Sequence, residues 1–244
     1  MTHVHFIGIG GSGLSAIARL LLESGYTVSG SDRALTPFAE EVRKAGASVY
    51  VGHHARNVAG ADWVVRSSAI PDDNPEVQAA LQKNIPVYKR ADFLGELMAE
   101  KTGIAIAGAH GKTTTTAMTA WVLTELKRDP SFIIGSVAKN LGVNARAGTG
   151  NLFVIEADEY DNMFLGLKPQ IEVITNLEHD HPDFFPTFEA MTQSFETFVN
   201  LLPADGTLIV CMEDAGAVSL IPHARKAGKN VVALAAHQQV VAFV

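Results

Sequence analysis

The stretch GAHGKTTTT, residues 108–116, is the part of the sequence from which the rest is best interpreted. It follows the apolar run IAIA at residues 104–107, which is typical of a buried strand, and precedes AMTAWVL at residues 117–123, which is typical of a helix. At such a junction, glycines let the backbone approach a polyphosphate, and the helix N-terminus offers unpaired N–H groups. A lysine adds positive charge, and a threonine hydroxyl can ligate Mg²⁺. The stretch therefore predicts a phosphate-binding loop.

The loop is shorter than the general phosphate-loop pattern. The glycine expected five residues before Gly111 is replaced by Ile106, and the nearest glycine is Gly108. The alternative is a glycine-rich turn that binds nothing. The Gly-Lys-Thr sequence favours phosphate binding, because it has a defined task at a strand-to-helix junction and no packing reason to be there.

The composition is that of a globular chain. Its 244 residues suffice for one large or two ordinary domains, with 47% hydrophobic and 18% charged residues. The net charge of −7 argues against a broad nucleic-acid-binding face and is compatible with a small pocket for an anion. Cys211 is the only cysteine, which excludes a disulfide framework. Without a signal peptide or a long apolar span, we expect a cytoplasmic protein with no membrane partner.

A second glycine loop lies near the N-terminus. The strand-like run VHFI at residues 4–7 leads into GIGGSG at residues 8–13, which has the G-x-G-x-x-G spacing and precedes apolar residues at helical intervals. The next strand ends at Asp32, about where a dinucleotide-binding unit places an acid on a ribose hydroxyl. The pattern predicts a bound nucleotide diphosphate, of which NAD is one candidate; the alternative is a turn that serves packing alone.

Other polar residues follow predicted strands in the first half of the chain. His53 and His54 follow a strand at residues 47–51, while Ser67 and Ser68 follow Trp63–Arg66. Because open parallel sheets bind ligands at their strand ends, these side chains are candidates for ligand contact. The serines are equally compatible with a plain turn, and the histidines with a surface or ribose-contacting position.

The alternation of strands and helices predicts an α/β fold with two domains. Lys101–Gly103 is the predicted joint between a Rossmann-like parallel-sheet domain, residues 1–100, and a phosphate-loop ATPase domain, residues 101–244. Residues 231–244 have strand character without a closing helix, so we expect this second domain to be incomplete.

Two buried strands in the second half end in acidic or imidazole side chains. The strand at residues 152–155 is followed by EADEYD, beginning at Glu156, whose four carboxylates would repel one another without a cation. The strand at residues 171–175 is followed by NLEHDHPD, which contains His181. A structural zinc is disfavoured, because no third clustered histidine or cysteine pair is present. A Mg²⁺ or Mn²⁺ site shared with nucleotide phosphates fits better, the alternative being a solvated acidic loop.

The order and spacing of these motifs resemble the Mur ligase family of peptidoglycan synthesis. The matching motifs are the glycine loop, G-x-H-G-K-T-T-T from Gly108, E-A-D-E from Glu156, and T-N-x-x-x-D-H ending at His181, and the resemblance covers essentially all 244 residues. It implies that a whole enzyme would continue through the ATPase domain and a third, amino-acid-binding domain. We therefore expect this chain to be a fragment unable to complete ligation by itself.

The resemblance also implies roles for individual residues. The N-terminal loop would hold the pyrophosphate of a UDP sugar rather than of NAD, with Gly10, Gly11, Ser12, Gly13, Asp32, His53, Ser67 and Ser68 around it. ATP would be bound by Gly108, Ala109, His110, Gly111, Lys112, Thr113 and Thr114, although His110 could instead only cap the loop. The catalytic residues would be Lys112, Glu156 and His181, and the Mg²⁺ or Mn²⁺ ligands Thr113, Glu156 and His181.

Two reactions of the family remain open. The motifs GIGGSGLS from Gly8 and SSAI from Ser67 resemble the members that join L-alanine to UDP-N-acetylmuramate through an acyl phosphate. Tyr160, where serine is usual, resembles members that attach a recycled tripeptide to the same sugar nucleotide, but FLGLKP from Phe164 returns to the first pattern. We favour L-alanine. A UDP-sugar-binding module without catalysis is a further alternative, whereas an NAD dehydrogenase leaves the second loop unexplained. The oligomeric state stays open.

Overall fold

The structure, a computed structural model, describes residues 1–235 and 241–243. It divides into two compact units, Met1–Phe93 with Leu141–Ala147, and Leu94–Asn140 with Gly148–Val244. Each unit contains its own sheet, built mainly of parallel strands, which confirms the predicted α/β class. No helix in the described part of the chain is both long and apolar enough to cross a membrane.

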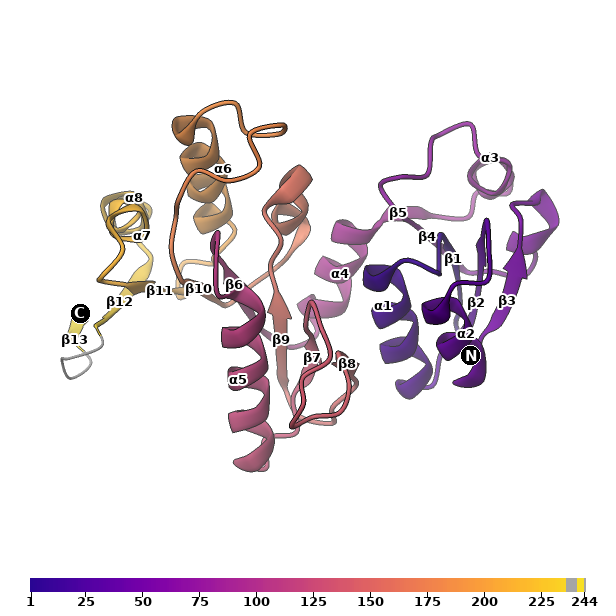
Figure 1. The fold of residues 1–244 in the computed structure, drawn as a ribbon, viewed down its shortest axis with the longest axis horizontal. Coiled ribbons are helices and arrows are strands. Elements are labelled where there is room, and N and C mark those ends of the chain that lie inside the picture. The colour runs from indigo at the N-terminus through magenta and orange to yellow at the C-terminus, as the bar shows by residue number, and fades with distance from the viewer. Residues whose placement is uncertain (236–240, 244) are drawn as a thin grey trace. The chain divides into compact units, whose positions relative to one another are not determined.

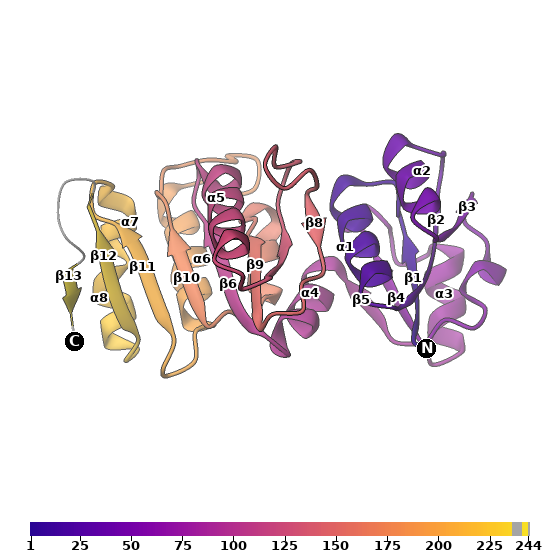
Figure 2. The ribbon, with the colours of Figure 1, turned by 90° about the horizontal axis from the view of Figure 1, so that it is seen from below.

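The sheet of the first unit has the strand order β3-β2-β1-β4-β5, and all of its strands are parallel. The strands are β1 (His3–Ile7), β2 (Thr27–Asp32), β3 (Ser48–Val51), β4 (Trp63–Arg66) and β5 (Val87–Lys89). Helices α1 (Ser12–Glu23) and α2 (Pro37–Lys44) cover one face, and α3 (Pro75–Gln82) covers the other (Figures 1 and 2). This is the doubly wound, Rossmann-like arrangement, in which ligands bind at the carboxyl ends of the strands.

Local signals begin the helices of the first unit. Thr36 accepts a hydrogen bond from the backbone of Ala39 at the start of α2, and Asn74 accepts one from Glu76 at the start of α3. Each cap is followed by proline, whose fixed φ suits the first helical position. A short 3₁₀ helix, η1 (Ala55–Val58), lies between β3 and β4, and α4 (Arg90–Ala99) follows β5.

The strands of the second unit lie in the order β13-β12-β11-β10-β6-β9-β7. They are β6 (Thr102–Ala107), β7 (Ser131–Ile133), β9 (Leu152–Glu156), β10 (Ile171–Ile174), β11 (Thr207–Cys211), β12 (Asn230–Leu234) and β13 (Val241–Phe243). The two-residue strand β8 (Ala145–Arg146) belongs to the segment Leu141–Ala147 of the first unit. Pairing is parallel from β7 through β9, β6, β10 and β11 to β12, and antiparallel between β12 and β13. The strand that carries the phosphate loop, β6, therefore lies between β9 and β10.

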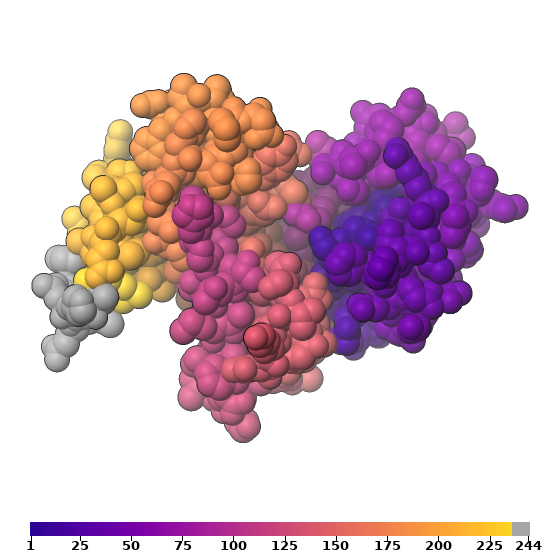
Figure 3. Space-filling model, in the orientation of Figure 1, coloured from indigo at the N-terminus to yellow at the C-terminus, as the bar shows by residue number. Residues whose placement is uncertain are grey.

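Helices cover both faces of this second sheet (Figures 1 and 2). Helix α5 (Lys112–Glu125) lies on one face, and α6 (Phe188–Asn200), α7 (Ala215–Ser219) and α8 (Ile221–Lys226) lie on the other. A 3₁₀ segment, η2 (Tyr160–Gly166), follows β9. The outer side of α5, magenta in Figure 3, is exposed to solvent, as are its side chains Met118 and Val122.

The elements differ from the prediction in several places, and β8, η1 and η2 are among those that were not predicted. Thr102 and Gly103, which the sequence suggests as part of a joint, are the first residues of β6 and pair with β9. The short helices α7 and α8 were not predicted. Residues 231–234 and 241–243 have the predicted strand structure, while 236–240 and 244 lie outside the described residues.

Candidate nucleotide and metal sites

The phosphate loop is held in shape by the end of the neighbouring strand β10. Gly108 has φ 137°, and a Cβ at this position would overlap the hydroxyl of Thr175. The Thr175 hydroxyl donates to the carbonyl of His110 at 2.7 Å, and Oδ1 of Asn176 accepts from the amide of His110 at 2.8 Å. Glycine is therefore required at 108, because backbone and strand end approach closely there. The shape of the loop is thus supported by hydrogen bonds within the chain.

Lys112, at the first position of α5, bridges this loop and a buried acid. Its Nζ donates to the carbonyl of Gly108 at 2.6 Å and to Oε1 of Glu159 at 2.7 Å. Glu159 is fully buried, and its Oε2 has no hydrogen-bond partner among the described residues. Burial raises the pKa of Glu159, and the hydrogen bond and charge of Lys112 only partly offset this effect. The lysine thus pairs with a buried carboxylate beside the N-terminus of α5.

The predicted pair Thr113 and Glu156 is in direct contact. The hydroxyl of Thr113 donates to Oε1 of Glu156 at 2.8 Å, and the amide of Gly135 donates to Oε2 at 2.6 Å. Glu156, the last residue of β9, thereby faces the N-terminus of α5. A hydroxyl beside a carboxylate at the end of a phosphate loop is a donor set that suits Mg²⁺.

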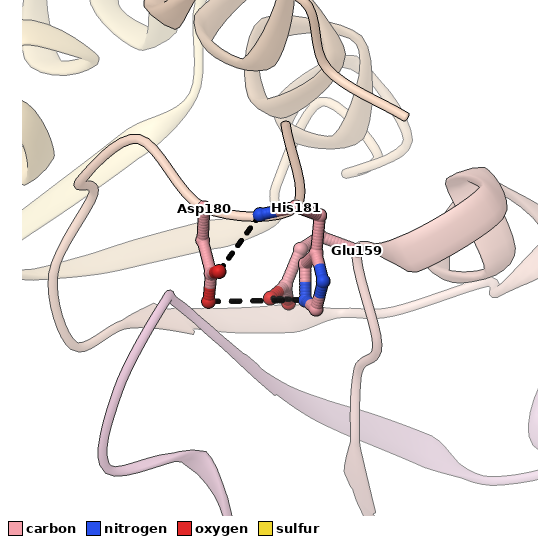
Figure 4. A group of neighbouring side chains, drawn as sticks. All are labelled: Glu159, Asp180 and His181. Carbon is pink, nitrogen blue, oxygen red and sulfur yellow. Dashed lines mark hydrogen bonds and ion pairs between the residues drawn. The ribbon is translucent and has the colours of Figure 1, made fainter. Parts of the chain in front are cut away.

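Glu159, Asp180 and His181 form a second cluster (Figure 4), and one ligand atom from each lies within 4.8 Å of the others. Nε2 of His181 is 3.6 Å from Oε1 of Glu159 and 3.8 Å from Oδ2 of Asp180. The backbone of His181 is left-handed, with φ 52°. The ring of Tyr160 meets the imidazole edge-on at 4.9 Å, while its hydroxyl donates to Asp183. Carboxylate oxygens with one imidazole suit Mg²⁺ or Mn²⁺.

The predicted metal ligands are therefore divided between two clusters. Thr113 and Glu156 are together, whereas His181 is paired with Glu159 and Asp180; within the described chain, no hydrogen bond or ion pair joins His181 to Glu156. Glu159 lies in the acidic run after β9, but its sequence position did not distinguish it from its neighbours. Its burial and its lysine partner do.

The remaining residues predicted to bind ATP belong to the same loop. His110, Gly111 and Thr114 are exposed, whereas Ala109 is buried against the sheet. Gly111 is the N-cap of α5 and has φ 81°, so the free backbone amides of the first turn begin beside it. An anion at this turn would meet those amides and the charge of Lys112.

In the first unit, Asp32 braces the glycine loop. Its Oδ2 accepts from the amide of Gly10 at 2.8 Å, and the Thr36 hydroxyl donates to the Gly10 carbonyl at 2.9 Å. The carbonyl of Ser31 accepts from the amides of Gly8 and Ile9. The glycine loop is thus held in shape by hydrogen bonds to residues at the carboxyl end of β2 and to Thr36.

Other predicted residues surround this loop. Ser67 lies beside Gly8, where an added Cβ would be 3.2 Å from that of Ser67, and its Oγ accepts from Ala69 as a turn residue does. Ser68, next to Ser67 in the chain, is exposed to solvent, as are Gly11 and Ser12 of the glycine loop itself. Gly13 faces the guanidinium of Arg90, which would have to move aside for a Cβ at this position. Arg90, to which the sequence assigned no role, brings positive charge to the loop.

His53 lies at the carboxyl end of β3, in contact with a buried acid. Its Nδ1 is 2.9 Å from Oγ of Ser31 and 3.4 Å from Oε2 of Glu76, a fully buried side chain. His54 is exposed, and its amide donates to the same carboxylate at 3.2 Å. Glu76 was not predicted, because nothing in its local sequence distinguishes it from an ordinary acid in the first turn of a helix.

Comparison with known proteins identifies the family of the chain. Residues 3–102 match the model of the Mur ligase family catalytic domain, and residues 106–243 match that of the Mur ligase middle domain. The chain belongs to the Mur ligase family. The resemblance of the sequence motifs to this family is therefore confirmed.

Among curated Mur ligases, the UDP-N-acetylmuramate–L-alanine ligase of Renibacterium salmoninarum is 50% identical over 94% of this chain and 49% of its own length. The ligase of the same name from Nitratidesulfovibrio vulgaris is 46% identical over 91% of this chain and 49% of its length. The chain thus spans about half the length of these relatives.

Solved structures of the family are also similar. The UDP-N-acetylmuramate:L-alanyl-gamma-D-glutamyl-meso-diaminopimelate ligase from Neisseria meningitides has a TM-score of 0.85 and 31% identity, covering 96% of this chain and 78% of that one. The UDP-N-acetylmuramate-alanine ligase from Thermotoga maritima has a TM-score of 0.79 and 29% identity, covering 98% and 54%. Both comparisons agree with the parallel-sheet fold of the two units.

Proposed function

We propose that this chain supplies the sugar-nucleotide-binding and ATP-binding parts of an ATP-dependent ligase that joins L-alanine to UDP-N-acetylmuramate. The observation that carries the proposal is the phosphate loop, in which Lys112 and Thr113 contact one acid just before η2 and one at the end of β9. The first unit would bind the UDP sugar at its glycine loop, through Gly10, Gly11, Ser12, Gly13, Asp32, His53, Ser67 and Ser68.

The first step of the proposed reaction brings together two anions, a carboxylate and the γ-phosphate of ATP. A carboxylate oxygen of UDP-N-acetylmuramate attacks the γ-phosphorus of ATP, the bond to the β-phosphate breaks, and ADP leaves. The amine of L-alanine then attacks the acyl carbon, loses a proton, and displaces phosphate. In the first step Lys112 and the amides of the α5 N-terminus would offset the repulsion between the carboxylate and the γ-phosphate.

The clusters fit divalent cations, since Glu159 is buried with an unpartnered oxygen and the donors are oxygens and one imidazole. Thr113 and Glu156 would hold one Mg²⁺, and His181 with Glu159 and Asp180 a second. When bound, these ions would supply charge that stabilises the transferring phosphoryl group. The catalytic residues would then be Lys112, Glu156 and His181.

L-alanine is preferred over a recycled tripeptide because the curated relatives that are 46% to 50% identical to this chain are named as L-alanine ligases. The tripeptide remains the second candidate because of Tyr160. With the first reaction, the protein would act in peptidoglycan synthesis in the cytoplasm, and so in cell-wall formation, cell shape and cell division.

Calorimetry with UDP-N-acetylmuramate, Mg²⁺–ATP and NADH tests the proposal. We expect the first two to bind and NADH not to bind; NADH binding without a response to the UDP sugar would contradict the proposal. Lys112→Ala should abolish ATP binding and leave UDP-sugar binding intact, because the two loops belong to separate units. To decide between the two reactions, phosphate release is measured with L-alanine and with the tripeptide. This assay uses a protein as long as the curated relatives.

A further inference from the structure

Glu76 lies inside the first unit, at the second residue of α3, and joins several elements. Its Oε2 accepts from the hydroxyl of Ser31 at 2.5 Å and is 3.5 Å from Nε2 of His5. Its Oε1 accepts from the side chain of Asn57 at 2.6 Å and from the backbone of His54 at 3.2 Å. A fully buried carboxylate thus links β1, β2, η1 and the turn after β3.

This cluster is directly behind the candidate sugar-nucleotide site. The backbone carbonyl of Ser31 holds the glycine loop, while its hydroxyl holds Glu76 and contacts His53. The side chains of Glu76 and His5 are 0% exposed, whereas that of His53 is 15% exposed. Of these three side chains, His53 is therefore the one that is partly exposed to solvent, at the carboxyl ends of the strands.

The hydrogen bonds determine where the proton on His53 lies. Burial works against the charge of Glu76, but the neighbouring imidazole of His5 and hydrogen bonds from Ser31 and Asn57 outweigh it and lower the pKa of Glu76 to about 2. Near neutral pH the carboxylate can only accept, so the single hydroxyl hydrogen of Ser31 points to Glu76. Towards His53, 2.9 Å away, the Ser31 oxygen can then only accept. Nδ1 of His53 must carry a hydrogen.

In the neutral imidazole, a hydrogen on Nδ1 leaves Nε2 with a free lone pair. No hydrogen bond to this Nε2 occurs within the described residues. We propose that Glu76, acting through Ser31, is a positioning residue that holds His53 in its Nδ1–H tautomer, so that Nε2 accepts a hydrogen bond from a hydroxyl or imide N–H of uridine diphosphate. The ligand part rests on the proposed function; the tautomer does not.

Glu76→Gln reverses the direction of these hydrogen bonds. Asn57 and the amide of His54 both donate to Oε1, so the amide oxygen of the new side chain stays there and its NH₂ faces Ser31. The Ser31 hydroxyl then accepts from this NH₂ and is free to donate to Nδ1 of His53. The imidazole should change to the Nε2–H tautomer, presenting a donor to a ligand group that is itself a donor.

The test combines ¹⁵N NMR of the histidine rings with calorimetry. Protonated and bare ring nitrogens differ strongly in ¹⁵N shift, and His53→Asn identifies the His53 signals. We expect a protonated Nδ1 and a bare Nε2 in the ligand-free protein, the reverse in Glu76→Gln, and about tenfold weaker UDP binding by that variant. Glu172→Gln, the same change in the other unit, should alter neither the tautomer of His53 nor the affinity for UDP.

Ser31→Ala tests whether the Glu76 carboxylate acts on His53 through the Ser31 hydroxyl or can also act directly. With the hydroxyl removed, Nδ1 of His53 faces Oε2 of Glu76 directly, 3.4 Å away, and should keep its hydrogen. A bare Nδ1 in the ligand-free wild type would overturn the inference even if Glu76→Gln does not fold, as would an unchanged tautomer in a folded Glu76→Gln. If the tautomers behave as expected but neither UDP nor UDP-N-acetylmuramate binds the wild type, the proposed function fails and the ligand part falls with it.

Discussion

We expect the side chain of Lys112 to stabilise the second unit, in addition to its proposed role in binding ATP. Its side chain is 15% exposed and neutralises Glu159, which is 0% exposed. Lys112→Ala should therefore lower the free energy of unfolding of the second unit by roughly 2–4 kcal/mol, because a buried carboxylate loses its counter-charge. Adding Glu159→Gln should restore most of that stability without restoring ATP affinity. Urea unfolding and ATP titration of both variants test this, and equal destabilisation in the two variants would contradict the ion pair.

Glu172, in β10, predicts an unusual dependence of stability on pH. Both of its carboxylate oxygens are buried without a partner among the described residues, and burial raises its pKa well above the usual value, with only partial compensation from the charge of Lys229. The folded state thus binds this proton more tightly than the unfolded state does. The stability that protonated Glu172 contributes is fully present below the ordinary glutamate pKa of 4.5 and is lost as pH rises through the folded pKa.

Glu172→Gln removes this titration. At pH 8 the variant should be more stable than the wild type by about 1–3 kcal/mol, and the difference should shrink towards pH 4. Thermal unfolding of both proteins between pH 4 and pH 9 measures it. A stability difference that does not change with pH would exclude Glu172 as the titrating group.

The roles of residues could be predicted from the sequence where a local motif marks them, but not where only a distant partner does. Lys112, Thr113 and Glu156 follow strands in recognisable motifs. Glu76 meets Ser31 across 45 positions, and Glu159 meets Lys112 across 47, so only the folded chain distinguishes these acids from solvated ones.

At the scale of elements, the junction of β6, its loop and α5 depends on close packing against β10. Gly108→Ala would place a methyl group against the Thr175 hydroxyl in a backbone conformation with φ 137°. Gly111→Ala is the matched control, since its Cβ would meet nothing within 4 Å although φ is 81°.

We expect Gly111→Ala to cost roughly 1–2 kcal/mol from backbone strain alone. Gly108→Ala should cost more and also abolish ATP binding, because the loop must move away from Thr175. Urea unfolding and ATP calorimetry distinguish the two variants. The same loss of stability and affinity in both would mean that backbone conformation, not packing against β10, is what glycine supplies.

The regular elements could be predicted well because their signals are local: apolar runs for β6, β9 and β10, and glycine loops before α1 and α5. Helices α7 and α8 were missed for a physical reason. They have only 5 and 6 residues, too few for a clear periodic pattern. Their positions are set by tertiary contacts instead, such as Asp214, which caps α7 and also accepts from the amide of Leu177.

Over the whole molecule, two of the buried glutamates, Glu76 and Glu172, give the two units opposite responses to acid. Glu76 has its pKa lowered from 4.5 to about 2, so its stabilising contribution to the first unit is present above pH 4.5 and is lost as pH falls towards 2. Glu172, with a raised pKa, contributes to the second unit at low pH instead.

We therefore expect the first unit to lose stability before the second as pH falls from 5 to 2. The chain has one reporter in each unit, since its 2 tryptophans are Trp63 in β4 and Trp121 in α5. Fluorescence of Trp63→Phe and Trp121→Phe variants during acid titration separates the transitions. A transition of Trp121 at higher pH than that of Trp63 would contradict this order.

The hydrogen bonds that shape the phosphate loop also set a time order for folding. His110 is joined to Asn176 across 66 positions of the chain, so the loop reaches its final form only after β10 has formed beside β6. A pairing that closes so long a loop is slow to form. A ribosome-bound chain that ends before Asn176 should therefore contain the whole GAHGKTTTT sequence and still be unable to hold a nucleotide.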